Sequence, residues 1–382
     1  MAGRTRYTLP LDGSLARKFD ALSDELDVRV LAARPRGAAG SDPRFRLYGP
    51  VAPGRLEGAA FWALFPFRVA RELRASRPDV VLSQGGHETA LVLAARALAR
   101  VPAKVVMDVH GDPAAATRLY GSPRRRALAP LGDAMTRFAL RRADAVRTIS
   151  AYTTRLVRER GVEPAATFPA FMDLDPFLAA PPAPLPETPV VLFVGVLERY
   201  KATDVLAQAW RLAAPRVPAA QLRIVGRGTM TATVELLVAE LPDRVEWIPR
   251  LPAVEVAGAL DAATVLVLPS RSEGLGRVVV EAFCRGRGVV GSRVGGIPDL
   301  VTDGDTGLLV EPGDPRALAD ALVRVLGEPG LAPRLGTAAR AAAEPWLATP
   351  EEYARRVRAL VEDVTGGAGP AGPAGPAGRG RP

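Results

Sequence analysis

The sequence predicts an α/β protein built from two domains. The chain has 382 residues, which is more than a single hydrophobic core usually serves. Short apolar runs that suit buried strands alternate with segments of helical periodicity over residues 1–170. Prolines then cluster at 181, 182, 184 and 186, and the same alternation starts again behind them. We therefore expect domains at 1–180 and 181–343, a helical segment at 344–365 and a Gly/Pro/Ala tail at 366–382.

Composition narrows the class of protein. Hydrophobic residues make up 48% of the chain, which suits a globular protein with two sizeable cores. The single cysteine, Cys284, excludes an internal disulfide and suits a reducing compartment. The first 13 residues lack the apolar region of a signal peptide, and the longest apolar stretches fall far short of about 20 residues. We expect a cytoplasmic protein.

Charge is unevenly distributed along the chain. Residues 1–170 hold 28 Lys/Arg against 16 Asp/Glu, a net charge of +12, whereas the remainder holds 22 against 25, a net charge of −3. The basic first half favours an anionic surface or an anionic small molecule, although an ordinary solvated surface is an equal alternative. No helix-turn-helix, zinc-finger or RNA-binding signature accompanies the charge, so we do not expect a nucleic-acid partner.

The chain opens with the pattern of a βαβ unit. Residues 7–11 suit a strand, residues 15–26 have helical spacing, and residues 28–33 suit a second strand. The turn between the first strand and the helix contains Gly13, where a phosphate could approach the helix N-terminus. The turn has no G-x-G-x-x-G, so it is not a dinucleotide fingerprint.

Both histidines of the chain follow predicted strands. Residues 79–82 form a strand with a loop at 83–88 that contains His87, and residues 104–109 form a strand that ends at His110. The carboxyl ends of parallel strands are where α/β proteins bind ligands. A histidine in a loop has a structural role as often as a functional one. Of the two histidines, we favour His110 as a site residue.

Two basic segments of the first half admit a second interpretation. Aromatic residues at 60–67 precede arginines at 68, 71, 74 and 77, and residues 122–142 form an amphipathic helix with six arginines. Either segment could contact an anionic membrane surface. A core-facing stripe with a solvated basic face is the preferred interpretation. A strand at 145–149 follows, and Ser150 is the expected N-cap of the next helix.

The second half repeats the α/β rhythm behind the linker. Asp173 and Asp175 have a spacing that suits a divalent cation, but their place beside the linker prolines argues against a metal site. The elements expected beyond them are listed in order: strand 190–194, helix 201–210, strand 221–225, helix 231–240, strand 244–248, helix 254–260, strand 264–268, strand 291–294, strand 306–310 and helix 315–325. Residues 338–364 are expected to be helical with interruptions at Pro345 and Pro350, and the tail to be disordered.

Residues 270–283 are the most informative stretch of the second half. A polar loop with Glu273, Gly274 and Gly276 leads into an apolar helix that carries Glu281. Free N–H groups and the positive end of the helix dipole form an anion site there. If helical throughout, the two carboxylates are about 12 Å apart, too far to share a proton. They would hold two ends of one long ligand. The alternative interpretation of this stretch alone is that Glu281 is a solvated helix residue and Glu273 an N-terminal helix carboxylate.

Taken together, these motifs resemble the GT-B-fold glycosyltransferases, specifically glycosyltransferase family 4 (glycosyl transferases group 1). In the second half the matching motifs are, in order, 193–197, Lys201, 224–228, 273–276, 280–282, 295–299 and 307–310. In the first half they are 12–14, 110–111, 143–145, Ser150 and Asp173. The resemblance is best over residues 190–325. It implies two Rossmann-like domains that face each other across a cleft, with the C-terminal helix crossing back to the first domain.

The resemblance also implies an activity. The chain would be a retaining, metal-independent transferase that moves a sugar from a nucleotide-diphosphate sugar to a hydroxyl of a glycan, lipid or small molecule, without a cofactor. An acceptor with a lipid phosphate or an anionic glycan would suit the basic first half, as would a peripheral contact with the inner face of the membrane. Rival interpretations are a nucleotide-sugar epimerase, a phosphorylase and a non-catalytic nucleotide-sugar-binding protein. The sequence has no identifiable pyridoxal-phosphate lysine motif, which argues against the phosphorylase.

Site residues carry over from the family position by position. Glu273, His110 and Lys201 would be catalytic: Glu273 with the amides of Gly274, Leu275 and Gly276 would hold the donor sugar, Lys201 would neutralise the diphosphate, and His110 would contact the sugar or acceptor. Glu281 would bind the ribose hydroxyls, and Gly13, Gly226 and Arg227 would line the donor site. The arginine that the family places next to Gly195 is Val196 in this chain, and we expect Arg199 to replace it.

Overall fold

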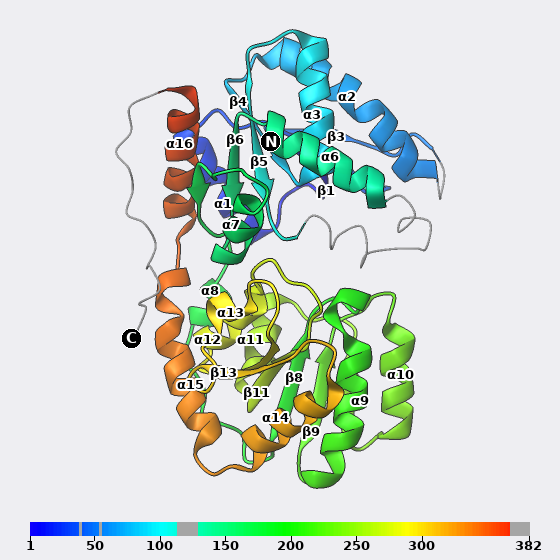
Figure 1. The fold of residues 1–382 in the computed structure, drawn as a ribbon, viewed down its shortest axis with the longest axis vertical. Helices are drawn as coiled ribbons and strands as arrows, with labels where there is room; N and C mark the ends of the chain where they lie inside the picture. The colour runs from blue at the N-terminus through cyan, green and yellow to red at the C-terminus, as the bar shows by residue number, and fades with distance from the viewer. Residues whose placement is uncertain (38–39, 53–55, 113–128, 367–382) are drawn as a thin grey trace.

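The computed structural model describes residues 1–37, 40–52, 56–112 and 129–366, arranged as two stacked α/β domains (Figure 1). The first contains a seven-stranded sheet of order β3-β2-β1-β4-β5-β6-β7, and the second a six-stranded sheet of order β10-β9-β8-β11-β12-β13. All strand pairs between these named strands are parallel. Two parallel sheets with helices between their strands confirm the predicted two-domain Rossmann-like architecture.

The elements of the first domain are β1 (Ala2–Arg6), α1 (Gly13–Glu25), β2 (Val30–Ala33), β3 (Phe45–Tyr48), α2 (Glu57–Ser76), β4 (Val80–Gln84), α3 (Gly86–Ala99), β5 (Lys104–Val109), α6 (Ala129–Arg142), β6 (Ala145–Thr148), α7 (Ala151–Arg158) and β7 (Ala166–Thr167). Those of the second are α8 (Asp175–Leu178), β8 (Val190–Val194), α9 (Thr203–Ala213), β9 (Gln221–Val225), α10 (Thr231–Glu240), β10 (Val245–Ile248), α11 (Ala253–Asp261), β11 (Val265–Leu268), α12 (Arg277–Cys284), β12 (Val289–Ser292), α13 (Ile297–Leu300), β13 (Gly307–Val310), α14 (Pro315–Gly327) and α15 (Leu331–Ala342). The last helix, α16 (Pro350–Thr365), follows the second domain in the chain. Short 3-10 turns lie at Arg199–Lys201, Ala214–Arg216 and Glu344–Trp346.

Several sequence-based boundaries were wrong in the first domain. The first strand is β1 at Ala2–Arg6 and not residues 7–11, and β3 was not predicted. Residues 2–6 contain no apolar run, but Ala2 pairs with both Leu31 and Ser83 at the centre of the sheet. Tyr7 instead packs its ring against Phe19 and Phe45. Tertiary pairing thus overrides the local hydrophobic pattern.

Two further boundaries moved. The loop expected at 83–88 is short, because β4 continues to Gln84 and α3 begins at Gly86, which places His87 in the first turn of a helix. The strand expected at 291–294 is β12 at Val289–Ser292. The N-terminal part of the helix expected at 122–142 and the whole tail from 367 lie outside the described residues.

Strand β8 shows why the second sheet is stable. Val191 and Phe193 belong to the core on one face of the sheet, whereas Leu192 belongs to the core on the other. Such continuous apolar runs are typical of parallel strands that are covered by helices on both sides. The run at 190–194 was therefore correctly predicted as a buried strand.

The C-terminal helix α16 packs on the first domain (Figure 1). Its residues Tyr353, Ala354, Val357 and Leu360 share a core with Phe19 and Leu22 of α1. Thr349 and Glu352 form a capping box that fixes the start of the helix. The chain therefore crosses between the domains twice, once between β7 and α8 and once before α16.

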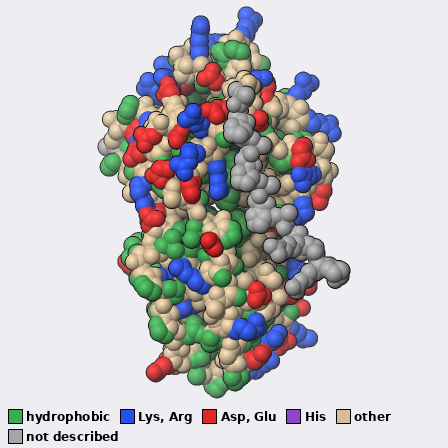
Figure 2. Space-filling view, turned by 90° about the vertical axis from the view of Figure 1, so that its left-hand side faces the viewer, with side chains coloured by type: hydrophobic (Ala, Val, Ile, Leu, Met, Phe, Trp, Pro, Cys, Tyr) green, Lys and Arg blue, Asp and Glu red, His purple; other side chains and the backbone are tan. Residues whose placement is uncertain are grey.

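Side chains of both charges interleave on the face of the molecule that carries α16 (Figure 2). Within the described ranges, no helix is long and apolar enough to cross a membrane.

Candidate functional site

A glycine-rich loop between β11 and α12 forms one wall of the candidate site. Every residue of β11 is buried, and α12 begins at Arg277 behind its N-cap Gly276. Gly276 has φ +87°, a left-handed conformation that favours glycine. Glu273 therefore lies in the loop and not in the helix, so the helical span expected between the two carboxylates does not apply.

Glu273 is held by two neighbours. Lys201 Nζ forms an ion pair with Glu273 Oε1, and Ser270 Oγ donates to the same oxygen at 2.8 Å. The side chains of Lys201 and Glu273 are only 12% and 10% exposed. A carboxylate with two donors and little solvent around it has a fixed orientation.

Glu281 follows Glu273 in the chain and lies within helix α12. Burial raises the pKa of its carboxyl, and the positive charges of Arg277 and Lys201 oppose that shift. Lys201 therefore lies in the electrostatic field of both glutamates. The sequence predicted these three residues as one constellation, and the structure brings them together.

The loops after β8 and β9 close against each other beside Lys201. Gly226 has φ +144°, and a Cβ built on it would lie 1.8 Å from the carbonyl oxygen of Gly195. The carbonyl of Arg227 accepts a hydrogen bond from Leu197 N at 3.1 Å, and its side chain is exposed. Only a glycine at 226 permits this approach of the two loops.

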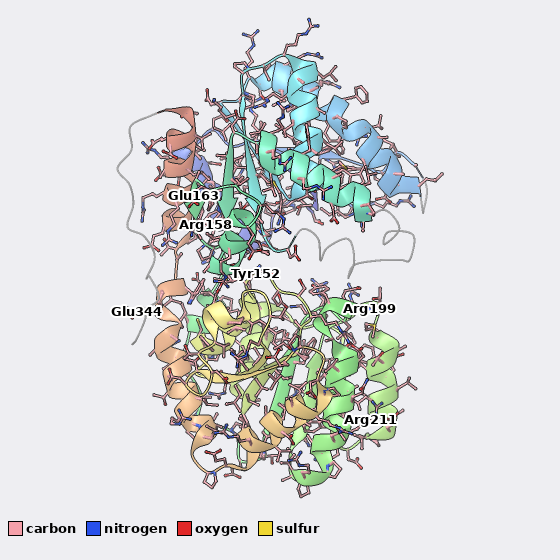
Figure 3. All side chains as sticks on the ribbon, viewed as in Figure 1. Tyr152, Arg158, Glu163, Arg199, Arg211 and Glu344 are labelled. Carbon is pink, nitrogen blue, oxygen red and sulfur yellow. The ribbon has the colours of Figure 1, made fainter. Side chains whose placement is uncertain are left out.

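Arg199 lies at the end of the second domain that faces the first (Figure 3). It is exposed, and its carbonyl accepts a hydrogen bond from Arg271 Nη1 at 2.9 Å. Val196, the position that the family fills with arginine, is 49% exposed. Both positions thus belong to the same solvent-facing loop region.

His110 forms the opposite wall, at the end of β5 in the first domain. Its Nε2 lies 2.8 Å from Asp108 Oδ2, and Arg147 Nη1 donates to the same oxygen at 2.7 Å. Burial disfavours the charge on Asp108, but Arg147 and His110 outweigh it and hold the pKa of this carboxyl below its usual value. The sequence analysis missed both Asp108 and Arg147. The available signal was one charged side chain inside each of two apolar strands.

The two walls touch. A Cβ built on Gly274 would lie 1.8 Å from the carbonyl oxygen of His110. Ser150 Oγ donates to the carbonyl of Gly274 at 2.9 Å, and Tyr152 N donates to Asp299 Oδ2 at 2.6 Å. Figure 3 shows Tyr152 between the domains. Ser150 is also the N-cap of α7, as predicted.

Helix α1 approaches the site from the first domain. Burial, followed by the charges of Arg147 and Arg277, lowers the pKa of Lys18 to about 8, while Asp108 opposes the shift. Gly13 is the first residue of α1, behind the N-cap Asp12, and the space around its Cβ position is open. Among the described residues no hydrogen bond connects Gly13 to the Glu273 cluster.

Two other sequence candidates lie apart from this cluster. Burial lowers the pKa of His87, with the charge of Asp133 acting against it, and His87 lies in α3. Asp173 and Asp175 both form ion pairs with Arg17, which accounts for their carboxylates without a metal ion.

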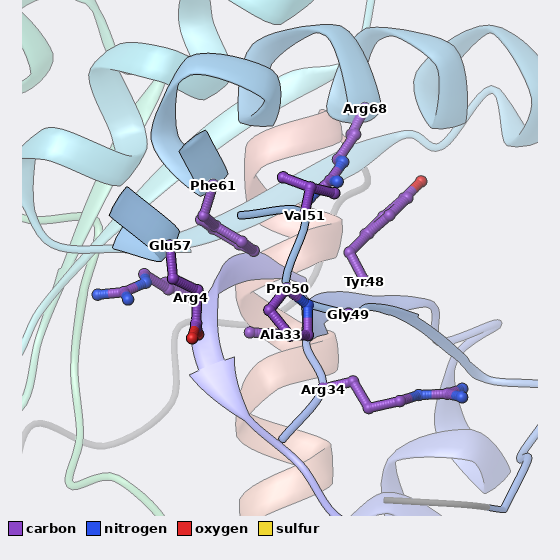
Figure 4. A pocket seen from close by; sticks show the side chains of 10 residues that line it. All are labelled: Arg4, Ala33, Arg34, Tyr48, Gly49, Pro50, Val51, Glu57, Phe61 and Arg68. Atoms are coloured by element: carbon purple, nitrogen blue, oxygen red, sulfur yellow. The ribbon is translucent and has the colours of Figure 1, made fainter. Parts of the chain in front are cut away.

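A pocket lies between helix α2 and the carboxyl ends of β2 and β3 (Figure 4). Its lining comprises Arg4, Ala33, Arg34, Tyr48, Gly49, Pro50, Val51, Glu57, Phe61 and Arg68. None of these residues belongs to the Glu273 cluster or to the group around His110.

Comparison with known proteins places this geometry in a family. Residues 188–328 match the family model described as "Glycosyl transferases group 1", and residues 13–169 match the "Glycosyl transferase 4-like domain". The two matches cover one domain each and leave residues 1–12, 170–187 and 329–382 outside. The chain belongs to the group 1 glycosyl transferases.

Curated relatives of this group 1 chain match over part of its length. A D-inositol 3-phosphate glycosyltransferase of Corynebacterium diphtheriae is 35% identical over 175 residues, 43% of this chain and 41% of the relative. One from Thermobifida fusca is 37% identical over 166 residues, 40% of this chain and 38% of the relative. The matched segment thus spans about two fifths of these relatives.

Solved structures extend the likeness of fold to nearly the whole group 1 chain. Sucrose-phosphate synthase from Thermosynechococcus elongatus has a TM-score of 0.74 at 24% identity, over 93% of each chain. HepE of Anabaena in complex with UDP-glucose has a TM-score of 0.69 at 16% identity, over 96% of this chain and 98% of the other. These matches show the GT-B fold that the sequence predicted.

Proposed function

We propose that the protein is a retaining glycosyltransferase that uses a nucleotide-diphosphate sugar as donor and needs no metal ion. The observation that carries the proposal is Glu273, fixed by Lys201 and Ser270 in the loop that touches His110 of the other domain. A carboxylate and a cation thus lie beside the contact between the two domains of a chain from a sugar-transferring family. The structure of HepE with UDP-glucose supports a uridine-diphosphate sugar as the first donor to test.

The proposed reaction follows from the charges of the site. The bond between the sugar C1 and the diphosphate oxygen breaks, a bond from C1 to the acceptor oxygen forms on the same face, and the acceptor proton leaves with the diphosphate. Negative charge grows on the diphosphate as the first bond breaks. Lys201 and the N-terminal amides of α12 are positioned to stabilise that charge.

A diphosphate is bound best where cations outweigh carboxylates. Lys201, Glu273 and Glu281 together carry one positive and two negative charges, and Arg277, whose charge acts on Glu281, adds a second positive charge. We propose that Arg199 supplies the charge that Val196 lacks. The amides of Gly274, Leu275 and Gly276 bind the sugar, and Glu281 binds the ribose. The remaining donor-site residues, which lie along the donor, are Gly13, Gly226 and Arg227. Closure of the domains excludes water, which would otherwise hydrolyse the donor.

The acceptor is proposed to bind on the first domain. Its excess of positive charge over residues 1–170 favours a hydroxyl acceptor that also carries an anionic group, and it would suit a peripheral contact with an anionic membrane. The relatives named D-inositol 3-phosphate glycosyltransferases support trying phosphorylated polyols first.

Transfer assays test the proposal. Release of nucleoside diphosphate and formation of product are measured for UDP-, GDP- and ADP-sugars with phosphorylated and plain polyols. We expect turnover with one donor class, retention of the anomeric configuration, and activity in the presence of EDTA. Glu273→Gln should abolish transfer without unfolding the protein, whereas Glu235→Gln on exposed α10 should leave it unchanged.

Three outcomes would contradict the proposal. Wild-type activity in Glu273→Gln would remove this residue from the site. Nucleotide binding without any turnover would instead favour a non-catalytic nucleotide-sugar-binding protein, the alternative that Val196 supports, and conversion of the donor without an acceptor would favour an epimerase.

A further inference from the structure

Asp108 and Arg147 form a buried ion pair behind His110. They are direct partners in the register of β5 and β6, and Arg147 Nη1 donates to Asp108 Oδ2 at 2.7 Å. The side chain of Arg147 is only 1% exposed. A buried ion pair is weak evidence for stability, because desolvation of both charges offsets much of their attraction. The pair therefore calls for a role other than stabilisation.

Arg147 cannot easily move. Its Nη2 donates to the carbonyls of Phe168 and Pro169, both at 2.9 Å. Its guanidinium carbon lies 3.9 Å from the centroid of the Phe168 ring. These contacts fix the guanidinium from three sides, and the guanidinium in turn fixes the carboxylate of Asp108.

Besides Arg147, the hydrogen-bond partner of the Asp108 carboxylate among the described residues is His110. Asp108 Oδ2 takes both Arg147 Nη1 and His110 Nε2, the latter at 2.8 Å. Asp108 Oδ1 and Arg147 Nε are buried without a hydrogen-bond partner in the part of the chain that the structure describes. Unsatisfied buried polar atoms are rare in native proteins and call for an explanation. Here the two unpaired atoms belong to groups that are held in the orientation that one imidazole, that of His110, requires.

The direction of the hydrogen bond follows from chemistry. An ionised carboxylate can only accept, so Nε2 of His110 must carry the hydrogen. In the neutral imidazole the other nitrogen, Nδ1, is then an acceptor. Lys18 and Tyr353 also face this pair, since both feel the charges of Asp108 and Arg147. Neither forms a hydrogen bond to the imidazole in the described part of the chain.

We propose that Asp108 and Arg147 are positioning residues that hold His110 as the Nε2–H tautomer, so that Nδ1 accepts a hydrogen bond from a hydroxyl of the bound sugar or acceptor. The imidazole is 30% exposed, and the His110 carbonyl lies against Gly274, next to Glu273. The ligand group opposite His110 is then a hydroxyl donor and not a phosphate. The ligand assignment rests on the proposed function, whereas the tautomer does not.

Nitrogen-15 NMR tests the tautomer directly on the full unliganded chain. The chain has two histidines, so a His87→Gln variant assigns the signals of His110. At pH 8 we expect a protonated Nε2 and an unprotonated Nδ1. A dominant Nδ1–H tautomer, or a doubly protonated ring at this pH, would overturn the proposal whether or not the protein transfers sugar.

A double variant tests the positioning role. Removing Asp108 alone would leave Arg147 buried without a counter-ion, so we replace both, as Asp108→Leu with Arg147→Met. We expect a mixture of tautomers, a fall of about tenfold in kcat/KM, as for one lost ligand hydrogen bond, and an unchanged affinity for UDP. The control is Arg158→Met with Glu163→Leu, an exposed ion pair on the same domain, which should change neither reading (Figure 3).

The outcomes separate the two proposals. A double variant that retains the pure Nε2–H tautomer would contradict the positioning role. Failure of the wild type to bind any nucleoside diphosphate would count against the proposed function and the ligand assignment, and would leave the tautomer measurement intact as a test of the buried pair.

Discussion

The contact between Gly274 and His110 gives the sharpest test of how the domains meet. A Cβ at position 274 would lie 1.8 Å from the His110 carbonyl oxygen and 3.2 Å from Gly111 Cα. An ordinary carbon–oxygen contact is about 3.3 Å, so the two segments must separate by about 1.5 Å to accept alanine. Gly274 does not have a positive φ. The obstacle to alanine is therefore the opposing domain and not the local backbone.

The expected cost falls on activity more than on stability. Misplacement of catalytic groups by about 1 Å can cost on the order of 100-fold in rate, so we expect Gly274→Ala to lower kcat/KM by about that factor. Loss of the hydrogen bond from Ser150 Oγ to the Gly274 carbonyl would destabilise the protein by about 1 kcal/mol.

Donor turnover and urea unfolding are measured together on this variant. Gly258→Ala in α11 is the matched control, because nothing lies within 4 Å of its Cβ position. Alanine there should stabilise the helix by about 0.5–1 kcal/mol and leave activity unchanged. Wild-type kcat/KM in Gly274→Ala would refute the reasoning that the closed contact between His110 and Gly274 forms the active arrangement.

Three further predictions concern charge and stability. Burial raises the pKa of Glu88 to about 7, so between about pH 4.5 and 7 the folded state keeps a proton that the unfolded state releases, and the stability from this group is lost as the pH rises. In urea titrations, the unfolding free energy of Glu88→Gln should therefore gain up to about 2.5 kcal/mol over that of the wild type between pH 5 and pH 8. An equal gain in exposed Glu235→Gln would contradict this. Arg287 is buried and donates hydrogen bonds to backbone carbonyls that include those of Leu260, Ala263 and Ala183. Arg287→Met should lower the free energy of unfolding by about 3 kcal/mol, whereas exposed Arg334→Met should change it little. Equal unfolding midpoints of the two variants would show that these bonds do not anchor the linker. Lys201→Met leaves Glu273 without its cation and should weaken nucleoside-diphosphate binding at least tenfold in calorimetry. Lys104→Met, at the far end of β5, should leave this binding unchanged. Unchanged binding in Lys201→Met would remove Lys201 from the donor site.

Local sequence patterns predicted the second domain well. The strands β8 and β9 and the helix α10 have the predicted bounds, because each is an apolar or amphipathic run that ends at proline, glycine or a polar loop. The first strand failed for the opposite reason. Residues 2–6 are polar or small and form β1 only because strands on both sides pair with them. No pattern within the segment itself reports that.

The candidate site divides in the same way. Glu273, Gly274 and Glu281 belong to one local motif, so the sequence alone could predict that they serve the same site. The pairing of Asp108 with Arg147 depends on the register of two strands 39 residues apart, and the contact of Gly274 with His110 depends on the docking of two domains. Neither can be derived from one sequence. The functional roles of these residues stay predictions.

Arg287 shows how the second domain is connected to the linker. Its guanidinium lies buried among backbone carbonyls of the linker and of α11, including those of Pro184 and Leu260. These hydrogen bonds serve the contact with the linker and not the ligand site.

The central claim is that the loop at Glu273 and helix α12 hold a nucleotide-diphosphate sugar. Calorimetric titration of UDP, GDP and ADP into the wild type and into Glu281→Ala tests it most directly. The proposed site predicts that one of the three nucleotides binds the wild type, and that its affinity falls at least tenfold in the folded Glu281→Ala variant. No binding of any of the three, or equal binding to both proteins, would contradict it.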